Sequence, residues 1–233
     1  MRMRKKPNLL PRMERCGAVL IRDPQEHKDR WRELMPDAVQ LRLELGCGKG
    51  RFTAETAARE PDVLFIAVER VPDAMVIAME RVVELGLTNV FFLDEDAVRL
   101  PQFFGPDEVD RIYINFCDPW PGQRHAKRRL TSEGFLNIYR QVLRDGGQIH
   151  FKTDNHDLFE WSLFQFPKAG YALSEVTRNL HEHGVQGVMT DYEEKFHNLG
   201  TPINRCVGTK GELPPMSGPA AKEAETAKEA GDE

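Results

Sequence analysis

The cysteine pattern of a metal centre or a disulfide framework is missing from this sequence. Its 233 residues include only four cysteines, Cys16, Cys47, Cys117 and Cys206. No two of them have the C-x-x-C spacing that is typical of zinc ligands. We therefore expect four small reduced thiols, no disulfide and no metal.

Long apolar runs are also missing. No uninterrupted apolar stretch approaches the roughly 18 residues that a membrane span requires. The first sixteen residues, MRMRKKPNLLPRMERC, are rich in charge and lack the continuous apolar region of a secretory signal. Hydrophobic residues still make up 40% of the chain, which is enough for the core of one domain. These features predict a cytoplasmic protein with no membrane partner.

Positive charge is scarce overall but concentrated in two places. The formal net charge is −5, yet residues 1–15 and 124–129 are strongly basic, and residues 222–233 are mainly acidic. Such an arrangement can steer a polyanion such as a nucleic acid to one face of an acidic body. For residues 1–15, a solvated surface segment is an equally good interpretation.

Strand and helix patterns alternate along the chain, which is typical of a doubly wound α/β sheet whose strands are mostly parallel. The predicted strands are 40–45, 64–69, 90–93, 110–116 and 148–152, and the predicted helices are 25–34, 51–59, 73–85, 132–143 and 155–166. Two further extended segments, 172–180 and 196–207, are expected to pair as an antiparallel hairpin at the sheet edge, which makes seven strands.

Three regions are expected from these patterns. Residues 1–24 form a flexible basic arm, and residues 25–207 form the folded domain. Residues 208–233 are rich in Pro, Gly, Ala, Glu and Lys. Because such a segment cannot bury enough apolar area to offset chain entropy, we expect a disordered acidic tail.

A glycine-rich turn follows the first predicted strand. Gly46, Gly48 and Gly50 stand between that strand and a predicted helix, where glycine lets the backbone turn tightly and approach a ligand. Glu44 precedes the turn, and the next two strands end at Glu69 and near Asp96. A carboxylate at the end of the second strand can accept both hydroxyls of a ribose.

The spacing favours a methyl donor over a dinucleotide. The turn has the pattern GxGxG, with Arg51 where the dinucleotide fingerprint requires its third glycine. Glu44 would repel a pyrophosphate, whereas carboxylates favour the sulfonium and amino groups of S-adenosylmethionine. Structural roles also stay open: Glu44 could pair with Lys49 or Arg51, and Glu69 with Arg70 could be a surface ion pair.

The most informative segment is DRIYINFCDPWPGQRHAKRRLT, residues 110–131. It places Asp118 and Trp120 directly after a predicted central strand. A basic cluster follows, formed by Arg124, His125, Lys127, Arg128 and Arg129. Ligands of open α/β sheets bind at the carboxyl ends of strands, so we expect an active-site rim that faces nucleic acid. Trp120 either stacks on a base or anchors its loop.

Together, LELGCGKGRF, INFCDPWP with RHAKRRL, FKTDN and TDYEEKF resemble the bacterial tRNA (guanine-N(7)-)-methyltransferases from about residue 40 to residue 206. The resemblance implies a class I, Rossmann-like methyltransferase fold and methylation of a guanine at position 46 in the variable loop of tRNA. It assigns S-adenosylmethionine to Glu44, Glu69, Asp96 and Asp118, with Asp118 in the active site. It assigns the substrate to Asp154, Thr190, Asp191, Tyr192 and Glu193, and RNA to residues 124–129. Many members have a lysine where this chain has Gly122, and Lys127 or the basic arm is expected to replace it.

Guanine N7 carries a lone pair and no proton, so its attack on a sulfonium methyl group requires no general base. We expect catalysis to come from alignment and electrostatics, with Asp118 orienting the donor or the guanine. The segment TDYE could instead be a capped turn, and His181 and His183 are interpreted as loop residues.

Two other functions compete with this one. A nicotinamide-dependent oxidoreductase is disfavoured by GxGxG and Glu44, and a catalytically inactive RNA-binding module is disfavoured by the acidic strand ends. The sequence leaves open whether the protein is a monomer or a homodimer.

Overall fold

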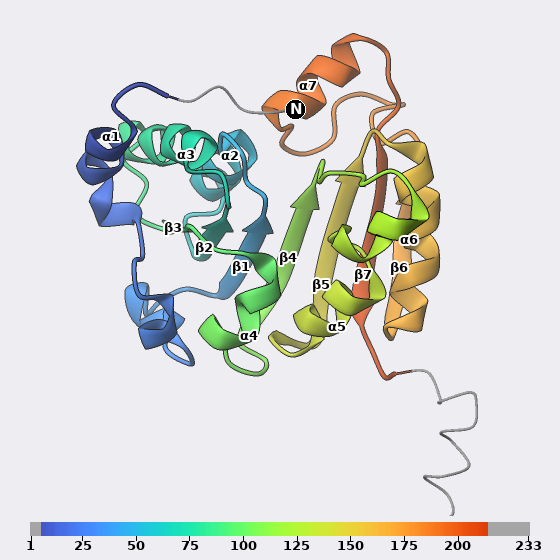
Figure 1. Cartoon of the computed structure of the whole chain (residues 1–233), viewed down its shortest axis with the longest axis horizontal. Coiled ribbons are helices and arrows are strands. Elements are labelled where there is room, and N and C mark those ends of the chain that lie inside the picture. Colours follow the sequence, from blue (N-terminus) through green and yellow to red (C-terminus); the bar gives the residue numbers. More distant parts are fainter. Residues whose placement is uncertain (1–5, 214–233) are drawn as a thin grey trace, which may run out of the picture.

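The computed structural model describes residues 6–213, and a seven-stranded sheet crosses the middle of this part of the chain (Figure 1). The strand order is β3-β2-β1-β4-β5-β7-β6. The strands are β1 (Gln40–Leu45), β2 (Val63–Val68), β3 (Val90–Leu93), β4 (Val109–Asn115), β5 (Leu143–Thr153), β6 (Tyr171–Thr177) and β7 (Asn204–Lys210). Strands β1 to β5 pair in parallel, and β7 is antiparallel to both β5 and β6. The predicted fold class is confirmed.

Helices pack on both faces of the sheet (Figure 1). On one face lie α4 (Leu100–Phe103), α5 (Glu133–Arg140) and α6 (His156–Lys168), and on the other lie α2 (Arg51–Arg59) and α3 (Pro72–Glu84). The side chains of alternate residues in β1 point to the same face of the sheet. Leu41, Leu43 and Leu45 therefore lie together in the core beneath α4, α5 and α6. Strand β2 is buried along its whole length, as expected for a parallel strand covered on both faces.

The N-terminal region is more ordered than the sequence suggests. We expected residues 1–24 to be a flexible arm and 25–34 to be a helix. Instead, residues 9–15 form helix α1 (Leu9–Arg15). The guanidinium of Arg12 binds the Glu80 carboxylate of α3 at 2.6 Å, which holds α1 on the body of the protein. Short 3₁₀ helices follow at Gly17–Val19, Pro24–His27 and Trp31–Leu34, and the Trp31 side chain is fully buried. The first five residues lie outside the described part.

The C-terminal third contains a helix that was not predicted from the sequence. The segment 196–207 was expected to be extended, but its first residues belong to helix α7 (Asp191–Asn198). Strand β7 then runs to Lys210, so the expected boundary between domain and tail at residue 208 falls inside a strand. The disorder expected for the tail beyond it concerns residues 214–233, which lie outside the described part.

The chain order of the strands reverses beside β1. Strands β2 and β3 extend the sheet from one side of β1, and β4 and β5 extend it from the other. In open α/β sheets, the loops that follow the strands at such a reversal diverge, and ligands bind in the crevice between them. The loops after β1 and β4 hold this position here. Among residues 6–213, no helix is both long enough and apolar enough to cross a lipid bilayer.

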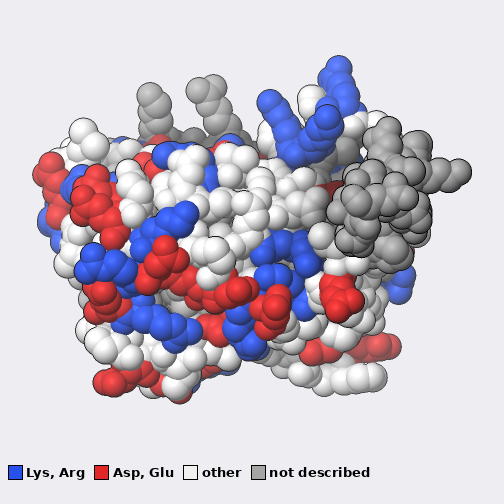
Figure 2. All heavy atoms as spheres, turned by 90° about the horizontal axis from the view of Figure 1, so that it is seen from below, with Lys and Arg blue, Asp and Glu red and all other residues white. Residues whose placement is uncertain are grey.

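The opposite edge, at the amino ends of the parallel strands, carries compensated charge. The Asp110 carboxylate accepts hydrogen bonds from the guanidinium groups of Arg32 and Arg144, both at 2.8 Å. Lys210 lies 3.2 Å from the carboxylates of both Asp107 and Asp145. Figure 2, which views this end from below, shows acidic and basic side chains interspersed over the surface.

Candidate active site

The glycine-rich turn after β1 opens onto free space. Gly46, Gly48 and Gly50 have φ angles of +77°, +57° and +72°, a region that favours glycine over other residues. A Cβ atom added at Gly46 or Gly48 would have no heavy atom within 4 Å, whereas one at Gly50 would lie 2.4 Å from the Cβ of Ala78. The first two glycines thus border the crevice, and the third lets α2 pack closely on α3.

The carboxylate of Glu69 shapes this turn. One of its oxygens accepts a hydrogen bond from the Gly48 amide at 2.9 Å, and the other accepts one from the Val71 amide at 2.9 Å. Arg70 does not pair with Glu69 but binds the Asp96 carboxylate at 2.7 Å. Glu69 thus contacts the glycine turn, and Asp96 follows the neighbouring strand β3 at the same edge of the sheet.

Two effects compete on the pKa of Asp96. Partial burial raises this pKa, but the hydrogen bond from the Val98 amide and the ion pair with Arg70 outweigh burial and lower it below its usual value. Asp96 is therefore a carboxylate at neutral pH, and it also caps the short 3₁₀ helix Ala97–Arg99.

The side chain of Glu44 lies at the end of β1 and is fully buried. Asn115 donates to its carboxylate at 3.0 Å, and Thr53 also donates a hydrogen bond to it. Neither Lys49 nor Arg51 is its partner, because Arg51 binds Glu55 and Glu194 of α7. Burial raises the pKa of Glu44 to about 7, although these hydrogen bonds favour the charged form. A buried acid at the crevice therefore titrates near neutral pH.

The loop after β4 presents Asp118 to solvent. Phe116 and Trp120 adopt φ angles of +53° and +43°, a region that bulky residues rarely occupy and that clusters at functional sites. Asp118 is exposed, and within residues 6–213 its carboxylate forms no hydrogen bond or ion pair. An unpaired carboxylate beside the crevice is available to a ligand.

The cations after Asp118 divide into two groups. Arg129 is half-buried and donates to the carbonyl oxygens of Pro119 and Trp120, at 3.0 and 3.2 Å, so it holds the loop. The guanidinium of Arg128 lies 4.7 Å from the centroid of the Trp120 ring. The side chains of Arg124, Lys127 and Arg128 are exposed, and none has a carboxylate partner in the described part of the chain. His125 is half-buried and accepts from Arg124 at 3.0 Å.

Helix α7 lies over the carboxyl ends of β4 and β5 (Figure 1). Thr190 begins it with a capping box, in which the Thr190 hydroxyl accepts from the Glu193 amide and the Glu193 carboxylate accepts from the Thr190 amide. Asp191 is exposed and pairs with Arg81 at 3.5 Å. The Tyr192 ring is half-exposed, 5.5 Å from the Phe116 ring of the loop after β4.

Glu193 differs from its neighbours because it is completely buried. The ammonium of Lys152 on β5 binds one oxygen at 2.6 Å, and the imidazole of His181 lies 3.0 Å from the other. Both partners are buried too. Glu193 was predicted to bind substrate, but the structure places it as the anchor of α7 on the sheet. His181 does lie in a loop, as predicted, yet it is part of this anchor.

Three side chains from different elements converge at the rim. Burial and then the nearby charges of Asp154 and Asp118 raise the pKa of Tyr192. Asp154 follows β5 and is half-buried, and this burial raises its own pKa. The ends of β4 and β5 and the start of α7 thus place two carboxyl groups and one phenol around a common space.

Three residues that complete the site were not among those predicted from the sequence. Asn115 positions Glu44, and Lys152 and His181 hold Glu193. Asn115 could have been found as the last strand residue before the loop. Lys152 alternates with Gln148 and His150 along β5, but nothing in the sequence indicates that its charge turns toward α7.

The sheet order, the open glycine turn and the acidic strand ends define a Rossmann-like methyltransferase. A family model described as "Putative methyltransferase" matches residues 38–206. Among solved structures, the 16S rRNA methyltransferase KamB aligns with a TM-score of 0.60 at 18% identity, over 80% of this chain and 94% of that one. A 16S rRNA (adenine(1408)-N(1))-methyltransferase from Catenulisporales acidiphilia, solved with its cosubstrate SAM, aligns with a TM-score of 0.57 at 11% identity, over 80% and 92%. These similarities show the fold.

Curated relatives are far more similar in sequence. The tRNA (guanine-N(7)-)-methyltransferase of Geobacillus kaustophilus is 44% identical over 88% of this chain and 95% of its own length. That of Streptococcus suis is 42% identical over 88% and 97%. The chain belongs to the tRNA (guanine-N(7)-)-methyltransferase family.

Proposed function

We propose that this enzyme transfers the methyl group of S-adenosylmethionine to N7 of a guanine in tRNA, at position 46 of the variable loop. The observation that carries the proposal is the near full-length similarity to relatives that bear this name. The site supports it, because an open glycine turn lies among carboxylates and beside exposed cations. The oxidoreductase alternative is no longer favoured.

The donor side of the crevice fits a cation. Glu44, Glu69, Asp96 and Asp118 supply negative charge, and Gly46, Gly48 and Gly50 leave room for a ligand beside the turn. When bound there, S-adenosylmethionine supplies an electrophilic methyl group on a positively charged sulfur. Glu69 keeps the turn in shape through the Gly48 amide. Because Glu44 is buried behind Asn115 and Thr53, it acts through its charge rather than by direct contact.

The acceptor side needs no proton acceptor, since guanine N7 presents a lone pair. Its residues have to hold the base in line with the methyl group. Asp118, Asp154 and Tyr192 border this space, and we assign the guanine edge to the two carboxyl groups and stacking to the phenol ring. Thr190 and Asp191 begin the helix that carries Tyr192, and Glu193 anchors that helix. Base exposure from the folded tRNA precedes this contact.

We assign tRNA phosphates to the exposed cations Arg124, Lys127 and Arg128, with His125 beside them and Arg129 supporting the loop. This chain has Gly122 in place of the lysine of many relatives. Gly122 precedes the 3₁₀ helix Gln123–Arg128, and we assign Lys127, the lysine of that helix, in its place. Since tRNA is the substrate, the cytoplasm is the proposed compartment, for a monomer or a homodimer.

The test uses the full chain, unmodified tRNA and donor labelled in its methyl group. We expect label on N7 of one guanine, which is located by chemical cleavage at 7-methylguanine. A tRNA transcript with adenine at position 46 is the control and should take up no label. Label at another atom would refute the assigned reaction, and bound but unlabelled tRNA would identify the inactive RNA-binding module instead.

A further inference from the structure

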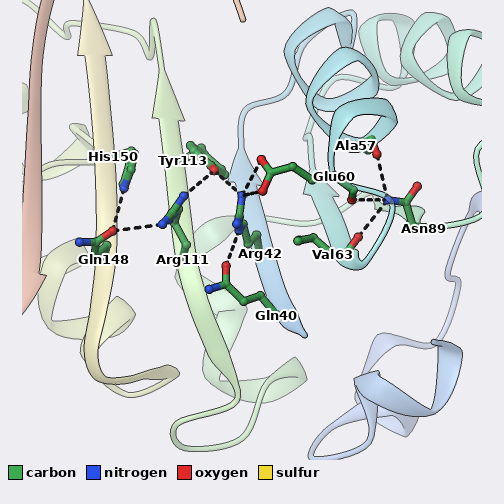
Figure 3. A network of polar contacts seen from close by, with 10 residues as sticks. All are labelled: Gln40, Arg42, Ala57, Glu60, Val63, Asn89, Arg111, Tyr113, Gln148 and His150. Carbon is green, nitrogen blue, oxygen red and sulfur yellow. Dashed lines mark hydrogen bonds and ion pairs between the residues drawn. The ribbon is translucent and has the colours of Figure 1, made fainter. Parts of the chain in front are cut away.

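Polar side chains extend from neighbouring strands on one face of the sheet and contact one another (Figure 3). Strands β1, β4, β5 and β7 direct their apolar side chains toward α4, α5 and α6, so the alternate residues point the other way. We call these alternate residues the polar sheet face: Gln40, Arg42, Arg111, Tyr113, Gln148, His150, Lys152 and Arg205. Helices α2 and α3 cover only the β1 to β3 side. Many of these side chains hydrogen-bond one another across the strands (Figure 3).

A cavity of about 470 Å³ lies on this face. Its floor includes Tyr113, His150 and Arg205, one wall is formed by α2, and the segment Gln186–Val188 forms another. Small-molecule sites in proteins have volumes of this order. Asp118, Asp154 and Tyr192 do not line the cavity, so it is distinct from the proposed methyl-transfer site.

Two buried polar atoms in the lining have no hydrogen-bond partner within the described protein. They are the Thr56 hydroxyl and the side-chain carbonyl oxygen of Asn115. Both residues are at least nine-tenths buried. An unsatisfied buried polar group costs about 1–3 kcal/mol, and both atoms are shielded from solvent behind the cavity lining rather than open to it.

The charge around the cavity is positive. Glu60 binds Arg42 at 2.7 Å, Glu193 binds Lys152, and Glu175 binds Arg205. Arg59 in the wall and Arg111 beside the floor have no carboxylate partner among residues 6–213; Arg111 instead donates to Tyr113 and Gln148 (Figure 3). The field acts on His150, whose pKa falls to about 3 through burial and then through Arg111, Arg205 and Arg42. A neutral imidazole and two uncompensated guanidinium groups favour an anion.

We propose that this cavity is a binding site for a small organic anion, which binds the guanidinium of Arg59 through a phosphate or carboxylate group and lies against Asn115 in the lining. Asn115 also holds Glu44, so an occupant would contact the residue that positions the donor-side acid. The site requires neither tRNA nor methyl transfer.

The experiment titrates the full chain with inorganic phosphate and, in a separate arm, with citrate, with chloride adjusted to keep ionic strength constant. The readouts are the NMR signals of the His150 ring, assigned with His150→Gln, and the melting temperature. We expect a saturable shift of the His150 signals and a parallel rise in melting temperature. Saturation by phosphate alone identifies a phosphate ligand, and saturation by citrate alone identifies a carboxylate ligand.

Variants separate this site from general charge attraction. Arg59→Gln should raise the half-saturating concentration about 5-fold or more, because one charge-assisted contact is lost. Arg22→Gln is the matched control, since Arg22 is exposed, lies outside the cavity and loses the same charge. Equal weakening in both variants, or His150 signals that move with neither anion, would overturn the proposal and leave the proposed methyl transfer untouched.

Discussion

The two edges of one sheet carry the same residue types in different states of pairing. At the amino edge, Asp110 is held by Arg32 and Arg144, and Lys210 lies between Asp107 and Asp145. At the carboxyl edge, Asp118 has no partner among residues 6–213, and Arg128 rests on Trp120 rather than on a carboxylate. Charges at the first edge satisfy one another, whereas Asp118 and Arg128 at the second have no oppositely charged partner in the described part of the chain and are free to bind. The pairing of the charges, and not the residue composition, distinguishes the edge that stabilises the fold from the edge that is proposed to bind ligands.

The carboxyl edge also contains one pair that is compensated and buried, Lys152 with Glu193. We expect that removing one partner of this buried ion pair will have the largest effect on the free energy of unfolding. Glu193→Ala would leave the ammonium of Lys152 buried without its partner, and we expect the free energy of unfolding to fall by about 3–5 kcal/mol. Urea unfolding followed by circular dichroism measures this change.

Asp107→Asn provides the control at the amino edge. Its ion pair with Lys210 is exposed on the aspartate side, and exposed pairs contribute about 0–1 kcal/mol. The double variant Lys152→Met with Glu193→Ala should lose less stability than Glu193→Ala alone, because no buried charge is then left unpaired. A double variant that is less stable than the single one would contradict the assigned role of this pair.

Turnover should depend on Asp118, the unpaired acid in the loop after β4, and not on Asp110, the paired acid within β4. We expect Asp118→Asn to lower the rate of methyl transfer about 100-fold or more, a loss typical of removing one preorganised electrostatic group. Because Asp118 is exposed, the free energy of unfolding of this variant should differ from wild type by less than about 0.5 kcal/mol. Asp110→Asn, near the amino end of β4, should transfer methyl groups at the wild-type rate. Single-turnover assays with labelled donor distinguish the two, and unchanged transfer by Asp118→Asn would remove this residue from the mechanism.

The ionisation of Glu44, at the carboxyl edge, makes the free energy of unfolding depend on pH. Its pKa is about 7 when folded, against 4.5 when exposed, so between these values the folded state keeps a proton that the unfolded chain has lost. The free energy of unfolding therefore falls as pH rises from about 4.5 to 7 and is then constant, a contribution on the order of 3 kcal/mol. Glu44→Gln cannot ionise, so we expect its stability relative to wild type to increase through this window.

As pH rises toward 7, donor binding should strengthen while the free energy of unfolding falls. A positively charged donor favours the ionised form of Glu44, so its binding near pH 7 should release a proton from wild type. Calorimetric titrations in buffers with different ionisation enthalpies measure this release. Glu44→Gln should bind the donor more weakly and release fewer protons; equal proton release by both proteins would assign the titration to another group.

The carboxyl edge was largely predictable from the sequence because its positions follow from strand ends. Alternating patterns located β1 to β5, and parallel strands bring their last residues to one edge. Gly46, Glu69 and Asp118 were therefore expected near one another, and the structure places all three there. The resemblance added the substrate residues that no periodicity indicates.

Helix α7 and its anchor were not predictable in the same way. The capping box of Thr190 and Glu193 was a usable signal, but the segment is short and strongly polar, so its helix depends on tertiary contacts. Nothing local shows that Glu193 is buried, because its partners Lys152 and His181 are distant in sequence. The order in residues 9–15 has the same cause, since Arg12 is held by Glu80 of α3.

The smallest effect concerns the exposed cations. Arg128 has no carboxylate partner among residues 6–213, so its loss should cost binding but little stability. We expect Arg128→Ala to weaken tRNA binding about 5- to 10-fold at low salt and to lower the slope of log affinity against log salt by about 1, because one fewer counterion is released. Arg144→Ala loses the same charge at the amino edge, where Asp110 already compensates it, so its slope should match wild type. Filter binding over a range of salt concentrations measures both slopes. A reduced slope in Arg144→Ala would mean that tRNA reaches the amino edge, and the contrast between the two edges would then reflect packing alone.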